Sequence, residues 1–82
     1  MMALTVLFEQ LGYRVCPEAG LEEGYEKIAI YASRGGATHA ARQLENGKWT
    51  SKLGENIDIE HTLAGLEGPD YGEVVRILKR EL

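Results

Sequence analysis

The dipeptide Asn46-Gly47, set between two runs of alternating residues, constrains this chain more than any other feature. Asparagine followed by glycine is the strongest short-range signal for a β-hairpin, because both central residues of a type I′ turn need a positive φ. A two-residue turn here determines the register of the hairpin. The cross-strand pairs that it predicts, all on one face, are Leu44 with Trp49, Arg42 with Ser51, and Ala40 with Leu53. We expect this face to be the core, anchored by Trp49.

A second hairpin precedes the first one. Residues 25–33 alternate between the two faces of a strand, with Ile28 and Ile30 on the same side, and two consecutive glycines mark the turn that follows. For the isoleucines to join the core face, the loop must contain an odd number of residues, since a two-residue turn would send them to the opposite side. We therefore predict a three-residue loop over residues 34–36 and a three-stranded antiparallel meander over residues 28–53.

The segments on either side of the meander predict shorter elements. In chain order we expect a helix over residues 3–11 ended by a left-handed Gly12, a strand over 13–16, a strand over 56–61 and a single helical turn over 63–66. The tail, residues 71–82, is ambiguous, because the spacing of its apolar residues fits a helix whereas its β-branched residues favour a strand. We predict a strand.

Length and composition indicate one domain. A chain of 82 residues with 44% hydrophobic and 27% charged residues can bury one thin core, and no linker divides it. Together with the predicted elements, this gives a single small α+β domain over residues 1–82, in which an N-terminal helix packs on an antiparallel sheet with the meander at its centre. The chain begins almost directly at that helix, without a good N-cap residue, so the domain looks cut short at its N-terminus.

Charge and cysteine content exclude several classes of function. The formal net charge is -4, with acidic and basic residues interspersed, so there is no basic stripe for a nucleic acid backbone. Cys16 is the only cysteine, which rules out an internal disulfide and favours the cytoplasm. The apolar run at residues 1–8 lacks a basic leader, a long hydrophobic centre and a cleavage site, so we expect neither a signal peptide nor a membrane span.

The second face of the predicted sheet carries His39 beside Tyr31, among small residues such as Ala29 and Ala41. A face this small and polar is typical of a solvated surface, but it also leaves room for a neighbouring subunit or for a helix supplied from elsewhere. His39 with Asp58 would form a general-base pair, because a carboxylate that accepts from one imidazole nitrogen orients the other.

Two further chemistries have less support from the residues. Cys16 could act as a nucleophile with His39 as its base, although a lone cysteine is more often a small buried hydrophobe. His61 with Asp58 and Glu60 has the residue types of a metal site, but strand alternation sends His61 away from the two acids. Because of this alternation we expect no metal. The glycine-rich stretches match neither a P-loop nor a dinucleotide-binding fingerprint, so we expect no cofactor.

Four blocks of the sequence resemble a family of uncharacterised bacterial proteins. They are Thr-His-Ala-Ala-Arg-Gln-Leu at residues 38–44, Gly-Lys-Trp-Thr-Ser-Lys-Leu-Gly at 47–54, Asp-Ile-Glu-His at 58–61 and Leu-Glu-Gly at 66–68. The likeness extends from the predicted first helix into the tail, where Tyr71-Gly72 and Val74-Val75 also match. Longer members of this family carry an upstream Asn-Cys segment that is similar to the nucleophile helix of papain-like and NlpC-like cysteine hydrolases.

The resemblance implies the sheet half of a papain-like fold, in which His39 would be the general base and Asp58 the residue that orients it. The upstream nucleophile segment is absent from this chain, and a base without its nucleophile retains little acyl-transfer rate. We therefore expect a non-catalytic domain that acts by self-association, as a homodimer, or by binding a protein partner through the face carrying His39. The alternative is an active cysteine hydrolase, an amidase or peptidase, in which Cys16 replaces the missing nucleophile.

Overall fold

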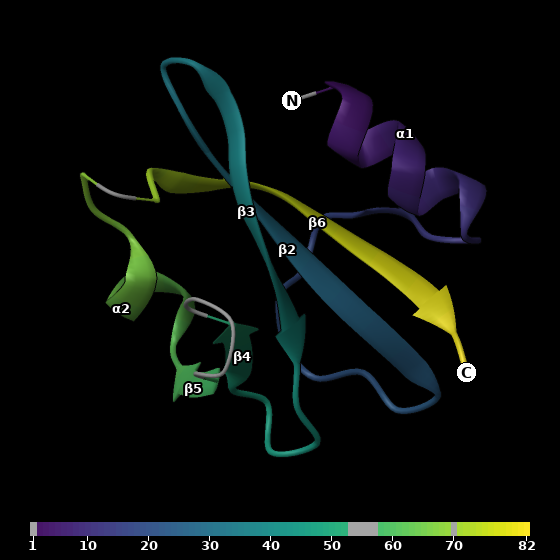
Figure 1. The fold of residues 1–82 in the computed structure, drawn as a ribbon. Helices are drawn as coiled ribbons and strands as arrows, with labels where there is room; N and C mark the ends of the chain where they lie inside the picture. Colours follow the sequence, from purple (N-terminus) through teal and green to yellow (C-terminus); the bar gives the residue numbers. More distant parts are fainter. Residues whose placement is uncertain (1, 53–57, 70) are drawn as a thin grey trace.

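The computed structural model describes residues 2–52, 58–69 and 71–82 (Figure 1). Its elements, in chain order, are α1 (Met2–Gln10), β1 (Arg14–Cys16), β2 (Tyr25–Ser33), β3 (Gly36–Gln43), β4 (Trp49–Lys52), β5 (Asp58–His61), α2 (Leu63–Leu66) and β6 (Glu73–Glu81). Among these residues the strands form one antiparallel sheet of six strands in the order β1-β6-β2-β3-β4-β5. The expected α+β architecture, with the meander β2-β3-β4, is confirmed at this level.

The tail of the chain is a strand, as predicted, and it lies in the interior of the sheet. β6 pairs with β1 through Leu78 and Val15, and with β2 through Leu78 and Ile28. Figure 1 shows β6 running beside β2 through the middle of the molecule. The β-branched residues of the tail suit this place, because they pack well on a pleated surface that has neighbours on both sides. Leu78 is fully buried there.

Helix α1 covers one face of the sheet, which we call the α1 face. The helix ends as predicted, where Gly12 adopts a φ of 96° and the N–H groups of Gly12 and Tyr13 donate to the carbonyls of Glu9 and Phe8. These are the two hydrogen bonds of a Schellman motif, which a left-handed glycine permits. The buried residues of the α1 face are Tyr13, Ile28, Ile30 and Leu78, and Leu4 and Phe8 of the helix pack against them.

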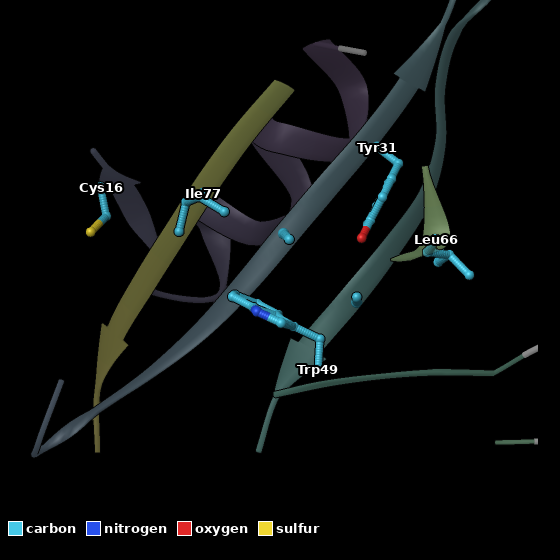
Figure 2. Close-up of a cluster of buried hydrophobic side chains, with 7 residues drawn as sticks. Cys16, Tyr31, Trp49, Leu66 and Ile77 are labelled. Carbon is cyan, nitrogen blue, oxygen red and sulfur yellow. The ribbon is translucent and has the colours of Figure 1, made fainter. Parts of the chain in front are cut away.

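The opposite face, which we call the His39 face, has a hydrophobic cluster of its own. Its buried residues are Cys16, Ala29, Tyr31, Ala41, Trp49, Leu66 and Ile77 (Figure 2). Figure 2 shows the Trp49 ring directed across the sheet toward Ile77, with Leu66 at the other side of the cluster. Leu63 and Tyr71 pack on the same cluster from the segment around α2. The prediction of a small, polar and open second face is therefore wrong.

The register predicted for the β3–β4 hairpin is wrong by one residue. Trp49 pairs with Gln43, whereas the sequence favoured Leu44 opposite Trp49. The connection holds three residues, because the Leu44 N–H donates to the Lys48 carbonyl at 2.7 Å. A shift of one residue sends every side chain of a strand to the other face. Trp49 and Ser51 therefore lie on the His39 face and not on the α1 face.

The reason for the shift lies in the turn. Gly47 has a φ of 88°, but no described residue other than glycine has a positive φ, so Asn46 does not adopt the conformation that a type I′ turn requires. A three-residue loop with a left-handed glycine is the next most common hairpin connection. It also buries Trp49, which is 3% exposed, and this burial contributes about 2–3 kcal/mol. Arg42 accordingly pairs with Thr50, and the predicted partner of Ala40 lies outside the described residues.

The first hairpin has the predicted register but not the predicted loop. Ile28 pairs with Arg42 and Ile30 with Ala40, so both isoleucines lie on the face that the sequence assigned to them beside Ala40. The turn, however, contains two residues, 34 and 35, because Ser33 pairs with Gly36. The ladder then skips Thr38, and this β-bulge supplies the extra residue that the three-residue loop was expected to provide.

The segment after the meander is close to its prediction. β5 covers four of the six residues expected for that strand, and residues 56 and 57 lie outside the described part of the chain. α2 is a single turn, and the Thr62 hydroxyl caps it by accepting the Gly65 N–H at 3.0 Å. Neither helix in the described ranges has the length and apolar content needed to cross a membrane.

Candidate functional site

His39 lies on β3 directly after the bulge, between two tyrosines. Its ring centroid is 5.8 Å from that of Tyr31 and 5.1 Å from that of Tyr71. The Nε2 atom is buried and has no hydrogen-bond partner among the described residues. Burial is the main cause that lowers the pKa of His39 below its ordinary 6.5, and repulsion from His61, when that ring is protonated, lowers it further. The low pKa favours a neutral imidazole at His39, and its buried nitrogen has no partner in the part of the chain that the structure describes.

The second histidine of this face, His61, forms a short hydrogen-bonded relay. The Ser51 Oγ lies 2.6 Å from His61 Nε2, and His61 Nδ1 lies 2.7 Å from the Thr62 carbonyl oxygen. Because a carbonyl can only accept, Nδ1 carries the hydrogen and the neutral ring accepts the Ser51 hydroxyl proton at Nε2. A hydroxyl, an imidazole and an oriented acceptor are thus aligned in one row, which we call the Ser51 relay.

The acceptor end of the Ser51 relay is held in place by the fold. Thr62 is the N-cap of α2, so its backbone is ordered by the helix that it starts. The Tyr31 hydroxyl donates to the Leu63 carbonyl at 2.9 Å, which ties the first turn of α2 to the centre of the sheet. Burial, and then the negative charge of Glu67, raises the pKa of Tyr31 to about 12, so this donor keeps its proton.

Sequence reasoning missed Ser51, and the cause is the register of the β3–β4 hairpin. The predicted pairing put Ser51 opposite Arg42 on the α1 face, where it could not meet His61. The alternation of residues 58–61 does send His61 away from Asp58 and Glu60, as expected. A correct hairpin register would have placed Ser51 on the face that His61 shares, and the pairing of β5 with β4 then brings the two side chains together.

The structure does not bring Asp58 to His39. Asp58 pairs with Lys52, whereas His61 pairs with Trp49, so successive residues of β5 point to opposite faces. Asp58 thus lies on the α1 face, in a shallow cavity that is also lined by Phe8. The general-base pair inferred from the sequence has no geometric support.

Cys16 shares the His39 face but lies far from His39. Its strand, β1, is separated from β3 by β6 and β2, which amounts to three strand spacings or roughly 14 Å. Figure 2 shows Cys16 beyond Ile77 at the edge of the cluster. The thiol donates to the Glu18 carbonyl at 3.3 Å and is buried. Within the described ranges, no three His, Cys, Asp or Glu residues are grouped as metal ligands.

The far end of the His39 face is closed by the loop before β2. The Lys27 side chain is 1% exposed, and its ammonium donates to the carbonyls of Glu18 at 2.9 Å and Gly20 at 2.8 Å. The Glu22 carboxylate lies 3.3 Å from the same nitrogen. A buried ammonium with three acceptors is fully satisfied, so Lys27 fastens this loop to the sheet and is not free to bind a ligand.

Comparison with known proteins identifies the family. One family model, described as a domain of unknown function (DUF7689), matches residues 1–79. No curated protein and no solved structure was found to match the chain. Because the family model covers nearly all of the sequence, the chain belongs to the DUF7689 family.

Proposed function

We propose that this domain acts by association, as a homodimer that two copies form through α1 and β1. The observation that carries the proposal is an apolar surface made by Val6, Leu7, Leu11 and Val15, whose exposed fractions lie between 42% and 53%. We call this surface the α1–β1 patch. Large apolar side chains that stay exposed on one helix and on the strand that follows it are typical of an interaction site on a small domain.

The four residues follow one another along the chain from α1 through the turn into β1. Leu7 and Leu11 are one helical turn apart. Val15 pairs with Leu78, a residue of the α1 face, so its side chain is on the same side of the sheet as α1. Figure 1 shows α1 and the segment that follows it at one side of the molecule, beside β6. The patch therefore joins a flank of the helix to an edge of the sheet.

That edge favours a second copy as the partner. β1 is the terminal strand in the sheet order and pairs only with β6 among the described strands, so its outer N–H and C=O groups can accept another strand. A two-fold axis beside Val15 would pair two β1 strands antiparallel and bring the two patches together, as an isologous interface requires. Since β1 has only three residues, we expect a weak dimer, with a dissociation constant on the order of 10 µM.

Association through the His39 face, which the sequence favoured, has less support. Trp49 and Leu66 already fill that face, and Tyr71 packs on them. A partner would have to displace these side chains before it reached His39. The α1–β1 patch requires no such rearrangement.

The cysteine-hydrolase alternative also has less support, because Cys16 is three strands away from His39. The resemblance to papain-like proteins stays a prediction from the sequence. A cytoplasmic location belongs to the same proposal, since Cys16 is a free thiol.

The proposal is tested by sedimentation equilibrium between about 1 and about 500 µM protein. We expect a monomer–dimer equilibrium for the wild type and at least about tenfold weaker association for Leu7→Glu and Val15→Glu, because a two-fold axis brings two added carboxylates together. Leu21→Glu is the matched control, since Leu21 is 56% exposed but lies on the loop before β2.

A wild type that stays monomeric over the whole range would contradict the proposal. Equal weakening by all three variants would contradict the assigned surface, because Leu21 lies outside the α1–β1 patch. Circular dichroism of each variant establishes that a loss of dimer is not a loss of fold.

A further inference from the structure

We propose that Ser51 is a nucleophile activated by His61, and that this site accepts small neutral acyl groups from esters and passes them to water. The proposal is independent of the dimer. It rests on the Ser51 relay, in which Oγ lies 2.6 Å from His61 Nε2 and Nδ1 lies 2.7 Å from the Thr62 carbonyl. A nucleophile in hydrogen-bond contact with a base, and a base oriented by a third group, is the constellation that nucleophilic catalysis needs.

The proton positions agree with this role. Thr62 offers a carbonyl oxygen, which binds only the protonated nitrogen of the ring, so Nδ1 is the donor and Nε2 keeps its lone pair. The lone pair faces the Ser51 hydroxyl, which can donate to it without any change of tautomer. The backbone carbonyl here has the orienting role that a carboxylate has in a serine protease.

The relay is assembled on rigid elements. β4 and β5 are paired through Trp49 and His61 and through Ser51 and Ile59, so the two side chains project from neighbouring strands on one face. Thr62 is held by the cap of α2, and the Tyr31 hydroxyl ties α2 to the sheet. Such support keeps nucleophile and base in contact before a substrate arrives, which is what lowers the entropic part of a barrier.

Burial determines the class of substrate. Ser51 is 3% exposed, while His61 is partly exposed on the edge strand β5, so we expect only a small group that approaches beside the His61 ring to reach the Ser51 oxygen. Trp49 and Ile59 flank the relay with apolar surface on the same face. A short uncharged acyl group fits these surroundings, because a charged one would lose its hydration without a partner.

The reaction runs in two balanced steps. The Ser51 oxygen attacks the ester carbonyl carbon, its proton passes to His61 Nε2, and the C–O bond of the leaving alcohol breaks as the alkoxide takes up that proton. Water then attacks the acyl-serine, gives a proton to the same nitrogen, and releases the carboxylic acid as the Ser51 hydroxyl is restored. Nothing is oxidised or reduced.

The first experiment treats the native protein with p-nitrophenyl acetate and locates the acetyl group by mass spectrometry of peptides. We expect acetylation of Ser51 in the wild type, none at this position in Ser51→Ala, and unchanged labelling of residue 51 in Ser33→Ala, since Ser33 is an exposed serine at the far end of β2. Labelling should be lost in urea. Release of p-nitrophenol is followed in the same samples, because rapid transfer to water would leave little acetyl group on the serine. A folded wild type that is not acetylated at Ser51 and releases p-nitrophenol no faster than Ser51→Ala would overturn the proposal.

A second variant keeps the inference testable should Ser51→Ala fail to fold. Ser51→Cys in a Cys16→Ser background places one thiol beside His61, and its alkylation rate by iodoacetamide is followed against pH. We expect an inflection below the ordinary thiol value of about 8.5, restored to that value by His61→Gln. An inflection that stays near about 8.5 with His61 present would show that this histidine does not act as a base on residue 51.

Discussion

Acidification should destabilise this domain through His39 at a pH where most proteins of this size are still stable. His39 is buried at Nε2 with no described partner, and burial followed by the charge of His61 lowers the pKa of its imidazole. In the unfolded chain the same group has a pKa of about 6.5. Between these two values the unfolded state binds a proton that the folded state does not, so the free energy of unfolding falls as the pH falls.

The size of the effect follows from the separation of the two pKa values. Each unit by which the folded value lies below 6.5 removes about 1.4 kcal/mol, and the loss begins near pH 6.5 and ends at the folded pKa. Above about pH 7.5 the stability is fully present. The other groups that face His39 are the rings of Tyr31 and Tyr71, and His61, whose charge when protonated adds to the effect.

Urea denaturation at a series of pH values between about 5 and about 8 measures this loss, with His39→Phe as the comparison. Phenylalanine keeps an aromatic ring between Tyr31 and Tyr71 but removes both the titration and the unsatisfied nitrogen. We expect it to be at least as stable as the wild type at pH 8, because an unpaired buried acceptor costs about 1 kcal/mol or more, and to lose less stability on acidification. If both proteins lose stability in parallel from pH 7 to pH 5, the reasoning about His39 is wrong.

Three further predictions concern the fold, and urea denaturation checks the first two. Gly72→Ala should cost about 2–3 kcal/mol or unfold the domain, because Gly72 has a φ of 82° and an added Cβ would collide with the Ala32 carbonyl. Lys27→Ala should cost about 2–3 kcal/mol, since it removes a buried side chain and the two hydrogen bonds that its ammonium donates to the Glu18 and Gly20 carbonyls. Deletion of Glu45 should shorten the loop to a two-residue Asn-Gly turn and leave the partners of Trp49 unchanged, with stability within about 1 kcal/mol. A red shift of the Trp49 fluorescence would contradict that last expectation.

The elements of this fold could be predicted from local patterns, because each depends on residues close together in the chain. Gly12 ends α1 through its own left-handed backbone. The β-branched content of residues 73–81 correctly outweighed their helical spacing, since a strand buried between two neighbours has no need to alternate. The position of β6 between β1 and β2 was not predictable in this way, because it depends on contacts with strands far away in the sequence.

The site was harder to predict, and two small backbone irregularities explain why. The bulge at Thr38 and the loop before Lys48 each change the count of residues between strands by one. In the first hairpin the predicted loop was one residue too long, but the isoleucines were still assigned to the correct face, since the bulge compensated for the shorter turn. The second hairpin has no such compensation, so the same kind of error moved Trp49 to the wrong side of the sheet.

The three-residue loop over residues 45–47 therefore determines which side chains lie on each face of the sheet, and not only the shape of one hairpin. If the full sequence formed a two-residue turn, with Leu44 opposite Trp49, then Trp49 and Ser51 would lie on the α1 face. The His39 face would then lack both its aromatic centre and the hydroxyl that meets His61. With the three-residue loop, the same shift that buries Trp49 also brings Ser51 Oγ within 2.6 Å of His61 Nε2. The stability of the His39 face and the chemistry proposed for it thus depend on one register, so a substitution that strains Gly47 should weaken both together.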